Sequence, residues 1–595
     1  MNCGAILIAG CVLFQTVTAY GQQRSFAGTN VTGQLVLIRT VNAKQAMQTL
    51  AAPSQGQVHS IAARIEGANA IDEFAAVQPR LGMQSIGSEL SAFDGALLRE
   101  ATHASLSIGT GTTSSGFMGL THFDQRNSNG GNQLSLEPPS PSIAVGNGYI
   151  LEGVNNAIQV YTTAGKPMLP RVLSTNELFG LPAAINRSTT PNRRGVNPTD
   201  MRVFFDYTIN RWFVLQRALE NDETGIPNGQ SHLYLAVSQT DDPAGVYNIY
   251  SMDTRDNGAL FCPCFVDFPQ IGADQYGFYI ASNEYGIGSN LFINAQIHAI
   301  SKASLAAGAP APTTYRFVLP PTTGYEFSIQ PTSTPPGASY FLGSGGLEYF
   351  VSSRTTAASN LMLWAMYNTS SLATASPNPT LVSITVPTLS YVGPDVATQK
   401  PGPLPFGSSL FPPRMLPFLD GGQDSRILSA VYSGGRVYVT FATQVRDENG
   451  RSLVGGAYVA LSPTVRAGIL SALVPRQDYL VVRGQHTLRP AIAVNGQGQG
   501  AIAFTLTGPD YYPSAAFVPI TPAAVGSIQI AAAGTGPEDG FTGYDPPTAP
   551  VARWGDYSGA VVASDGSIWM VTEYIPTAPR TEFANWGTYI ARFVP

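Results

Sequence analysis

The sequence predicts an all-β protein, a β-propeller of about seven four-stranded blades. Three observations predict this fold. The 595-residue chain contains 61 Gly, 45 Pro and 26 Tyr, a composition typical of turn-rich β structure. One hairpin pattern recurs along the chain, and another strand pair follows most of its copies. Radial repetition leaves few exposed sheet edges, so a propeller accommodates such repeats well.

The first 21 residues predict an export signal peptide. The apolar run "AILIAGCVLF" is too short to span a bilayer as a helix, and Ala19 and Gly21 are the small residues that precede a cleavage site before Gln22. The segment "IAGC" also fits a lipobox with a lipidated Cys11. We therefore expect a secreted, periplasmic or cell-surface protein, with a lipoprotein anchored at Cys11 as the alternative. No later segment has 18 uninterrupted apolar residues, so we expect no transmembrane segment.

Residues 22–115 break the repeat pattern and form a partly irregular N-terminal segment. Within it, "NAKQAMQTLAA" predicts a short helix capped by Asn42, and "IGTGTTSSGF" predicts a flexible connection. Residues 116–595 form the propeller domain. We expect the ring to close where the last strand, "TYIARFV", lies beside "FMGLTHF" from before the first blade.

The recurring hairpin has a Pro or small residue, an apolar strand, a Gly/Asn/Asp turn and an alternating apolar strand. Its clearest copies are "PSIAVGNGYILEGVNN", "PQIGADQYGFYIASNE", "PAIAVNGQGQGAIAFT" and "SGAVVASDGSIWMVTE". Weaker copies are "MRVFFDYTINRWFVLQ", "ILSAVYSGGRVYVTFA" and "QPTSTPPGASYFLGS". The seven copies predict seven blades, with six as the alternative. A β-sandwich, or a tandem of sandwiches, is the competing architecture.

Charge and cysteine content limit the function. Charged residues are 12% of the chain, the formal net charge is -6, and no Lys/Arg cluster offers nucleic acid a footprint, so we expect no nucleic-acid partner. After signal removal, Cys262 and Cys264 remain. A local disulfide or two free thiols is favoured over a metal site, which would need further ligands. The sequence contains no zinc-protease, nucleophile-elbow, Walker or haem-attachment motif, and it carries no signal for an oligomeric state.

Several phrases resemble a known family. "GLTHFDQRNSNGGNQLSLEPPSPSIAVGNGYILEGVNNAIQVY", "LAVSQTDDPAGVYNIY", "CPCFVDFPQIGADQYGFYIASNEY" and "RWGDYSGAVV" are similar to exported bacterial proteins with β-propeller folds, mostly of unassigned function. The resemblance covers residues 117–595 and implies the fold, with no catalytic residues. "ASDGSIW" is distantly similar to the Asp-box turn of sialidase-type propellers, where that turn is structural.

The hairpin pattern also predicts a candidate site. In a hairpin, the residue that begins the first strand and the residue that ends the second lie at the same end, opposite the turn. If the first strand of every blade is innermost, these residues gather at one mouth of the central channel. The resulting ligand-binding candidates are Asp200, Arg217, Asp267, Asn283, Glu284, Arg489, Asp556, Glu573 and Tyr574.

Three interpretations of this mouth remain open. The residues can be clasps that bond neighbouring blades. They can bind a glycan, a peptide or protein, or a cation, for which Ca²⁺ is the cofactor that acids and amides suit. They can also form a sialidase-like or other propeller glycosidase site with paired carboxylates, for which Asp267, Asp556 and Glu573 are the candidates. In a sialidase proper, Arg217, Arg489 and Tyr574 would supply the arginines and the nucleophile.

Overall fold

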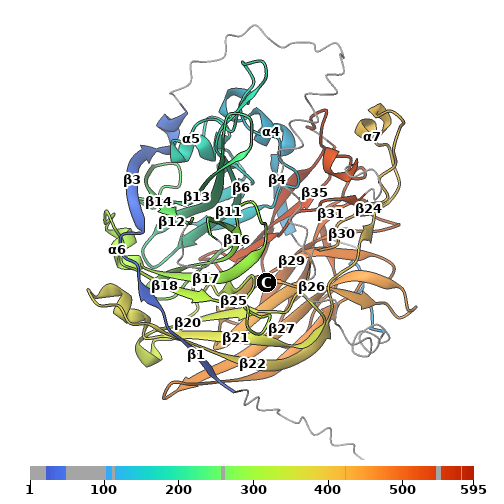
Figure 1. The fold of residues 1–595 in the computed structure, drawn as a ribbon. Coiled ribbons are helices and arrows are strands. Elements are labelled where there is room, and N and C mark those ends of the chain that lie inside the picture. The colour runs from blue at the N-terminus through green and yellow to red at the C-terminus, as the bar shows by residue number, and fades with distance from the viewer. Residues whose placement is uncertain are drawn as a thin grey trace, which may run out of the picture.

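Seven antiparallel sheets arranged in a ring make up the fold. The computed structural model describes residues 22–47, 102–109, 114–255, 262–422, 424–544, 551–577 and 579–595. In this part of the chain, seven sheets of four or five strands follow one another in sequence order around the molecule, from cyan through green, yellow and orange to red (Figure 1). The first strand of each sheet contacts that of the next sheet, and the first strand of the seventh contacts that of the first. The predicted β-propeller fold is therefore confirmed.

We number the sheets as blades 1 to 7 and describe each from its inner strand outward. Blade 1 contains β5 (Ser142–Gly146), β6 (Tyr149–Val154), β7 (Ala157–Thr162) and β8 (Leu173–Ser174). Blade 2 contains β11 (Asn197–Asp206), β12 (Arg211–Asn221), β13 (Pro227–Ser238) and β14 (Val246–Asp253). Blade 3 contains β15 (Cys264–Ala273), β16 (Gly277–Gly286), β17 (Phe292–Ser301) and β18 (Thr314–Leu319).

The remaining four blades have the same order. Blade 4 contains β19 (Gln330–Pro331), β20 (Leu347–Ser352), β21 (Ala358–Tyr367) and β22 (Thr380–Tyr391). Blade 5 contains β25 (Ile427–Ser433), β26 (Arg436–Arg446), β27 (Ser452–Arg466) and β28 (Ile469–Leu480). Blade 6 contains β29 (His486–Val494), β30 (Gly500–Thr507), β31 (Ser514–Ile520) and β32 (Gln529–Ala532). Blade 7 contains β34 (Gly559–Val562), β35 (Ile568–Tyr574), β36 (Gly587–Phe593) and β4 (Ser114–Thr121).

Blade 7 closes the ring with a strand from the other end of the propeller domain. β4 pairs antiparallel with β36, from Gly587 opposite Thr121 to Phe593 opposite Ser114. This is the pairing predicted for "FMGLTHF" and "TYIARFV". Such closure joins the two ends of a repeat array and leaves no blade incomplete.

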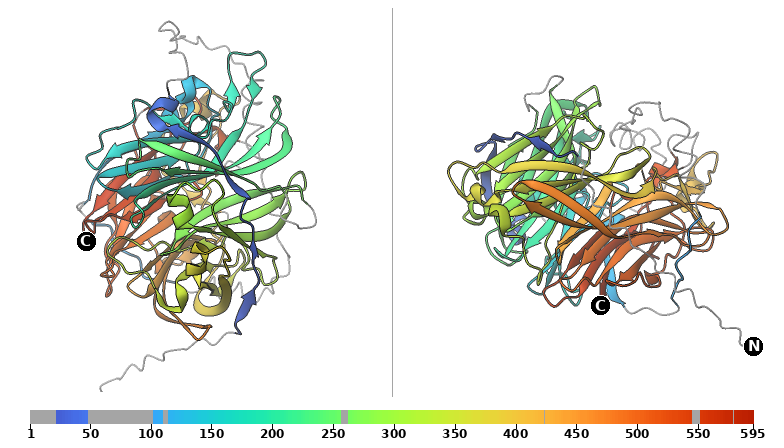
Figure 2. Two further views of the ribbon diagram at one scale, coloured as in Figure 1. Left: turned by 90° about the vertical axis from the view of Figure 1, so that its left-hand side faces the viewer. Right: turned by 90° about the horizontal axis from the view of Figure 1, so that it is seen from below.

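The N-terminal segment runs along the outside of three blades. β1 (Arg24–Phe26) pairs with β22, β2 (Thr29–Asn30) with β18 and β3 (Leu35–Asn42) with β14. It therefore adds a fifth strand to blades 4, 3 and 2, and Figure 2 (left) shows it crossing their outer edges. These edges would otherwise offer unpaired backbone groups.

A predicted helix cap in this segment is confirmed. The side chain of Asn42 accepts the N–H groups of Lys44 and Gln45 at the start of α1 (Ala43–Ala46). The predicted signal peptide, Cys11 and the residues between 47 and 102 lie outside the described residues. Of the predicted connection at residues 108–117, the last four residues belong to β4, and residues 110–113 also lie outside the described part.

Short elements connect the blades. The helices are α4 (His122–Asn127), α5 (Thr175–Phe179), α6 (Lys302–Ala306), α7 (Pro405–Ser409), η1 (Asn129–Gly131), η2 (Gly343–Gly345), η3 (Thr369–Ala373) and η4 (Phe541–Tyr544). Two small sheets pair β9 (Ile185–Asn186) with β10 (Arg193–Arg194), and β24 (Phe418–Leu419) with both β23 (Ala397–Thr398) and β33 (Val551–Ala552). No helix among the described residues is long and apolar enough to cross a membrane.

The hydrophobic core lies between the blades. Successive side chains on a strand point to opposite faces, and every blade has a neighbour on each face. The layer between blades 2 and 3, for example, packs Phe213 and Leu235 with Phe278 and Ile280. Clusters of this kind fill all seven interfaces between neighbouring blades. The ring is therefore held by side-chain packing from blade to blade.

Cys262 and Cys264 form a disulfide at the start of β15. The local-disulfide alternative that the sequence left open is the one found.

Candidate functional site: the charged mouth of the ring

A repeated β-bulge shapes one end of the ring. Near the start of their blades' first strands, Asp200, Phe268 and Arg489 have positive φ angles of 56°, 50° and 52°. At each of these positions the register between the first and second strands shifts. A bulge leaves a residue out of the ladder and redirects its side chain. Three blades therefore present unpaired residues at the same end, which we call the mouth.

Arg217 on β12 holds two carboxylates from neighbouring blades. It forms an ion pair and a hydrogen bond with Asp200, and its Nη2 lies 3.3 Å from Oδ1 of Asp267. All three side chains are largely buried. Burial raises the pKa of Asp267 to about 6, although Arg217 opposes this rise. Burial would lower the pKa of Arg217, but the two aspartates outweigh it and raise that pKa.

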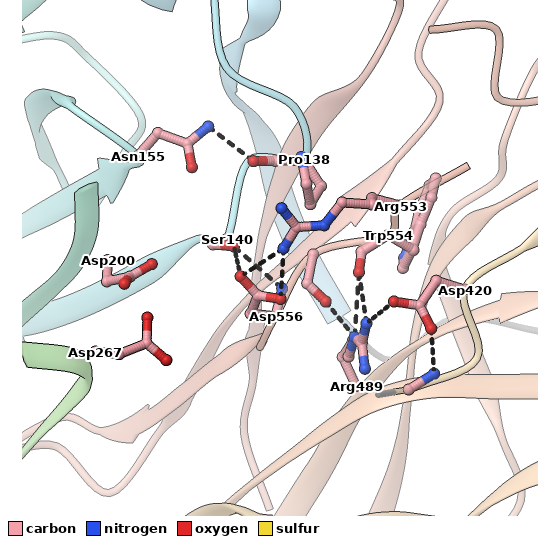
Figure 3. A network of polar contacts seen from close by, with 12 residues as sticks. Pro138, Ser140, Asn155, Asp200, Asp267, Asp420, Arg489, Arg553, Trp554 and Asp556 are labelled. Carbon is pink, nitrogen blue, oxygen red and sulfur yellow. Dashed lines mark hydrogen bonds and ion pairs between the residues drawn. The ribbon is translucent and has the colours of Figure 1, made fainter. Parts of the chain in front are cut away.

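Asp556 lies across the mouth from this triad. Figure 3 shows the carboxylates of Asp200, Asp267 and Asp556 directed toward the same space. Oδ1 of Asp556 lies 3.2 Å from Nη2 of Arg553. The main-chain N–H of Asp556 donates to Oγ of Ser140 at 3.1 Å. Burial would raise the pKa of Asp556, but Arg553 and Arg489 outweigh it and lower that pKa. The pKa of Asp556 is therefore shifted in the opposite direction from that of Asp267.

Two further ion pairs complete the mouth. Arg489 donates to the carbonyl of Trp554 at 2.8 Å and to Asp420 at 3.0 Å, as Figure 3 shows. Arg426 lies 2.7 Å from Asp424, immediately before β25. Every aspartate of the mouth is thus paired with an arginine.

The channel beneath the mouth is filled. Phe268, Leu428 and Tyr557 pack together as an apolar floor, and the guanidinium of Arg202 lies 3.3 Å from the centre of the Tyr557 ring. The cavity between this floor and the charged residues measures about 10 Å³, the space of about one water molecule. A ligand of this mouth must therefore lie across it and cannot enter the channel.

Asn283 and Glu573 hold blades together beneath the mouth. The register pairs Asp267 with Asn283, as predicted. The amide of Asn283 donates to Oγ of Ser328 at 3.0 Å and accepts the N–H of Ser328 at 2.7 Å, which joins blade 3 to blade 4. Oε2 of Glu573 accepts the N–H of Gly555 at 2.8 Å, and burial raises the pKa of Glu573 well above its ordinary value. Asn283 therefore acts as a clasp between blades. The side chain of Glu573 holds the loop before its own blade, and its main-chain carbonyl accepts the hydroxyl of Thr505 in blade 6 at 2.8 Å.

Glu284 and Tyr574 do not join the mouth. Glu284 follows Asn283 in the chain, and Tyr574 follows Glu573. Because successive side chains on a strand point to opposite faces, Glu284 and Tyr574 point away from the face on which Asn283 and Glu573 lie. Glu284 lies inside blade 3, where burial raises its pKa to about 8. The ring of Tyr574 packs edge-on against Tyr589 with centroids 5.8 Å apart, and burial raises its pKa to about 12.

The mouth therefore gathers five of the nine predicted residues, namely Asp200, Arg217, Asp267, Arg489 and Asp556. It also contains five charged residues outside the predicted set, which are Arg202, Asp420, Asp424, Arg426 and Arg553. Four of these lie within eight residues before the first strand of a blade. A charged residue within eight residues before the first strand of a blade is the sequence signal that would have identified these four residues.

The described residues do not bring together a simple metal site. No three His, Cys, Asp or Glu side chains among them converge as ligands. A Ca²⁺ ion at the mouth would have to compete with the arginines for the same carboxylates.

A larger cavity, of about 470 Å³, lies at the opposite end of the ring. The loop at residues 337–343 and the turns of blades 5 and 6 line it, with Tyr340, Phe341 and Tyr432 as its aromatic residues. The turn-bearing end therefore presents aromatic side chains as well as the expected glycines.

Fold and mouth define the class of protein as an all-β propeller with balanced charges at one channel opening. No protein-family model and no curated protein matches the chain. Similar solved structures include the Trypanosoma rangeli sialidase in complex with sialic acid, with 9% identity, a TM-score of 0.32 and coverage of 76% of this chain and 60% of that chain. The NanB sialidase from Streptococcus pneumoniae has 12% identity, a TM-score of 0.31 and coverage of 76% and 68%.

A third similar structure is the α-L-arabinofuranosidase from Lactobacillus brevis, with 11% identity, a TM-score of 0.26 and coverage of 62% of this chain and 83% of that chain. The chain thus spans about 60% of the length of the T. rangeli enzyme that it matches. These similarities assign no role to a residue of this chain.

Proposed function

We propose that the protein is an exported propeller that binds a glycan across the charged mouth. The observation that carries this proposal is a ring of partly exposed Asp–Arg pairs around an aromatic floor. Side-chain exposure reaches 34% for Arg553, 23% for Asp420 and 20% for Asp556. These groups accept and donate the hydrogen bonds that sugar hydroxyls require, and the Phe268 ring supplies an apolar surface beneath them.

The charge balance favours a glycan over a peptide or a cation. The mouth contains five arginines and five aspartates, which are Arg202, Arg217, Arg426, Arg489, Arg553, Asp200, Asp267, Asp420, Asp424 and Asp556. Their formal charges cancel, so the mouth offers little attraction to a strongly charged ligand. A neutral ligand with many hydroxyls makes the best use of alternating donors and acceptors.

Export is part of the proposal. The disulfide between Cys262 and Cys264 supports it because disulfides persist in oxidising compartments outside the cytoplasm. N-terminal sequencing of the native protein tests it, and we expect a start near Gln22. A start at a lipidated Cys11 would give the anchored form, and an intact Met1 would contradict export.

A glycoside hydrolase is the second candidate, and Asp267 is the observation in its favour. A pKa of about 6 suits a general acid, and Asp556, with its lowered pKa, would be the ionised partner. Against it, Arg217 engages Asp200 and Asp267, and Arg553 engages Asp556. Carboxylates held in this way are poorly placed to attack or protonate a substrate.

A glycan-binding screen separates the two candidates. The probe is the full chain, as wild type and as the double variant Asp267→Asn, Asp556→Asn, on an array of neutral and acidic glycans. The matched control is Asp565→Asn in the same blade, because Asp565 is 55% exposed and pairs with Arg592 at the turn-bearing end. We expect the wild type and the control to bind the same glycans and the double variant to lose at least tenfold in affinity.

Other outcomes decide against glycan binding at the mouth. Equal binding by all three proteins would move the site elsewhere. Release of chromophore from a nitrophenyl glycoside by the wild type, and not by the double variant, would make the protein an enzyme. Binding of Ca²⁺ or a peptide by the wild type, with no glycan bound, would replace the proposed ligand.

A further inference from the structure

Two buried glutamates face each other where the ring closes. Glu137 precedes blade 1, Glu538 lies between blades 6 and 7, and their exposed fractions are 3% and 1%. A Cβ placed on Gly540 would overlap Oε1 of Glu137 and lie 2.5 Å from Oε1 of Glu538. The two carboxylates therefore come close together beside residue 540, where only a glycine leaves room for the side chain of Glu137.

This point is surrounded by buried oxygen atoms, of which only the Thr542 hydroxyl carries a proton to donate. Both carboxylate oxygens of Glu538, Oε1 of Glu137 and Oγ1 of Thr542 are buried and have no hydrogen-bond partner. Oε2 of Glu137 accepts the N–H of Thr542 at 2.9 Å, which brings the threonine to the same place. Leaving a buried charged acceptor unsatisfied costs more than an ordinary hydrogen bond contributes.

The neighbouring carboxylate shows how this protein otherwise satisfies a buried acid. Asp539 accepts the N–H groups of Phe406 and Gly407 at 2.6 and 3.0 Å, and Arg580 lies 3.4 Å away. Glu538, the adjacent residue, receives none of these donors. The missing positive partner of the glutamate pair must therefore come from outside the chain or be a proton.

We propose that Glu137, Glu538 and Thr542 form a cation site, and that Ca²⁺ is the ion that fits it. All the donor atoms are hard oxygens, two carboxylates balance the charge of a divalent ion, and main-chain carbonyls or water can complete its six to eight ligands. The ion would link the segment before blade 1 to the loop before η4. It would therefore staple the ring at its closure.

A proton shared by the two carboxyl groups is the competing explanation. Burial raises the pKa of both Glu137 and Glu538. The charge of Glu137 raises the pKa of Glu538 further, and a hydrogen bond from Glu538 opposes the rise of the pKa of Glu137. If the two carboxyl groups share a proton, the native state binds more protons than the unfolded chain. The free energy of unfolding then falls as the pH rises above about 4.3. Ca²⁺ requires both carboxylates ionised, so its effect grows as the pH rises.

The test is a Ca²⁺ titration of the full chain after chelator treatment and dialysis, at pH 7.5, with Mg²⁺ in parallel. We expect about one bound Ca²⁺ per chain in equilibrium dialysis. At a hundredfold excess over Kd we also expect a rise in Tm of about 2 to 4 °C, a modest shift because the chain is large. Glu538→Gln should abolish both responses and, without metal, melt no lower than the wild type, since the substitution removes a like-charge contact.

Two further variants keep the result clear. Glu137→Gln should behave as Glu538→Gln does, and it replaces that variant if the latter does not fold. Glu448→Gln is the control, because Glu448 pairs with Arg483 near the surface, and it should keep the full Ca²⁺ response. The absence of bound Ca²⁺ in the wild type, or an undiminished response in both glutamine variants, would overturn the proposal. A Tm difference between the wild type and Glu538→Gln that changes in favour of the variant from pH 5 to pH 8, regardless of Ca²⁺, would assign the pair to a shared proton.

Discussion

Arg217 is the residue on which the mouth depends most. It lies between Asp200 and Asp267 and is the guanidinium that both carboxylates share. Asp267 is therefore the aspartate with the least compensation, and its pKa of about 6 reflects this. Substitution of Arg217 and substitution of Asp267 should therefore change the stability of the protein by different amounts.

We predict that Arg217→Met destabilises the protein by about 3 to 5 kcal/mol, because it leaves two buried carboxylates without their cation. Asp267→Asn should change stability at pH 7 far less, since the ion pair between Arg217 and Asp200 remains. Urea unfolding followed by circular dichroism measures both. Equal losses for the two variants would contradict the shared-arginine arrangement.

The pH dependence follows from the same carboxyl group. The folded-state pKa of Asp267 is raised from 3.8 to about 6, so the native state holds a proton that the unfolded chain has lost. Stability contributed by this group is full below pH 4 and is lost as the pH rises through 6. The stability difference between the wild type and Asp267→Asn should therefore change in favour of the variant between pH 4.5 and 7. A difference that is constant over this range would show that Asp267 does not titrate there.

At the scale of elements, β4 is the most important strand. It completes the sheet of blade 7 by pairing with β36, and it contacts β6 of blade 1. Glu152 on β6 accepts the N–H of Leu120 at 3.0 Å and the hydroxyl of Tyr161 at 3.1 Å, and it also bonds Thr588. It thereby ties β4 and β36 to blade 1. Burial raises the pKa of Glu152 to about 7. Gly119 on β4 leaves room for this carboxylate.

We predict that Gly119→Ala destabilises the protein by about 1 to 3 kcal/mol, the usual effect of overpacking. The added Cβ would lie 2.5 Å from Oγ1 of Thr588 and 2.7 Å from Oε2 of Glu152. Gly536→Ala is the matched control, because no atom lies within 4 Å of its added Cβ, and it should be close to neutral. A Tm of Gly119→Ala equal to that of the control would mean that Glu152 does not occupy this place.

The elements were easier to predict than the individual site residues. Strand alternation and turn residues predicted six of the seven hairpins, the Asn42 cap and the pairing of β4 with β36, because these depend on local pattern. In blade 4 the predicted copy ends at residue 344, whereas the second strand is β20 (Leu347–Ser352). Two of the three outer strands, β1 and β2, are only three and two residues long, so no periodicity marks them. Their pairing with blades 4, 3 and 2 depends on contacts between distant parts of the chain.

At the mouth, the sequence predicted which end of each hairpin carries charge. It could not distinguish Asp267 from Glu284, which differ in the face of the strand on which they lie. The bulge at Phe268 sets that face, and a bulge has no reliable signal in a single sequence. The arginines that neutralise the mouth come from loops whose positions depend on the closed ring.

At the scale of the whole molecule, the ring has two different ends. One is the mouth, with paired charges over a filled channel, and the other has a cavity of about 470 Å³ between a loop and two turns. Packing between all seven blades joins the two ends into one body. The proposed cation site lies at the seam of this body, so its loss should lower the stability of the ring without altering the charges of the mouth.

The most direct test of the proposed glycan-binding mouth is carboxyl footprinting by carbodiimide labelling and mass spectrometry, with and without the tightest-binding glycan from the array. We predict that labelling of Asp420 and Asp556, which are 23% and 20% exposed, falls at least threefold when the glycan is bound. Labelling of Asp565 and Asp478, which are 55% and 43% exposed, should not change. Unchanged labelling of Asp420 and Asp556 at saturating glycan would contradict binding at the mouth.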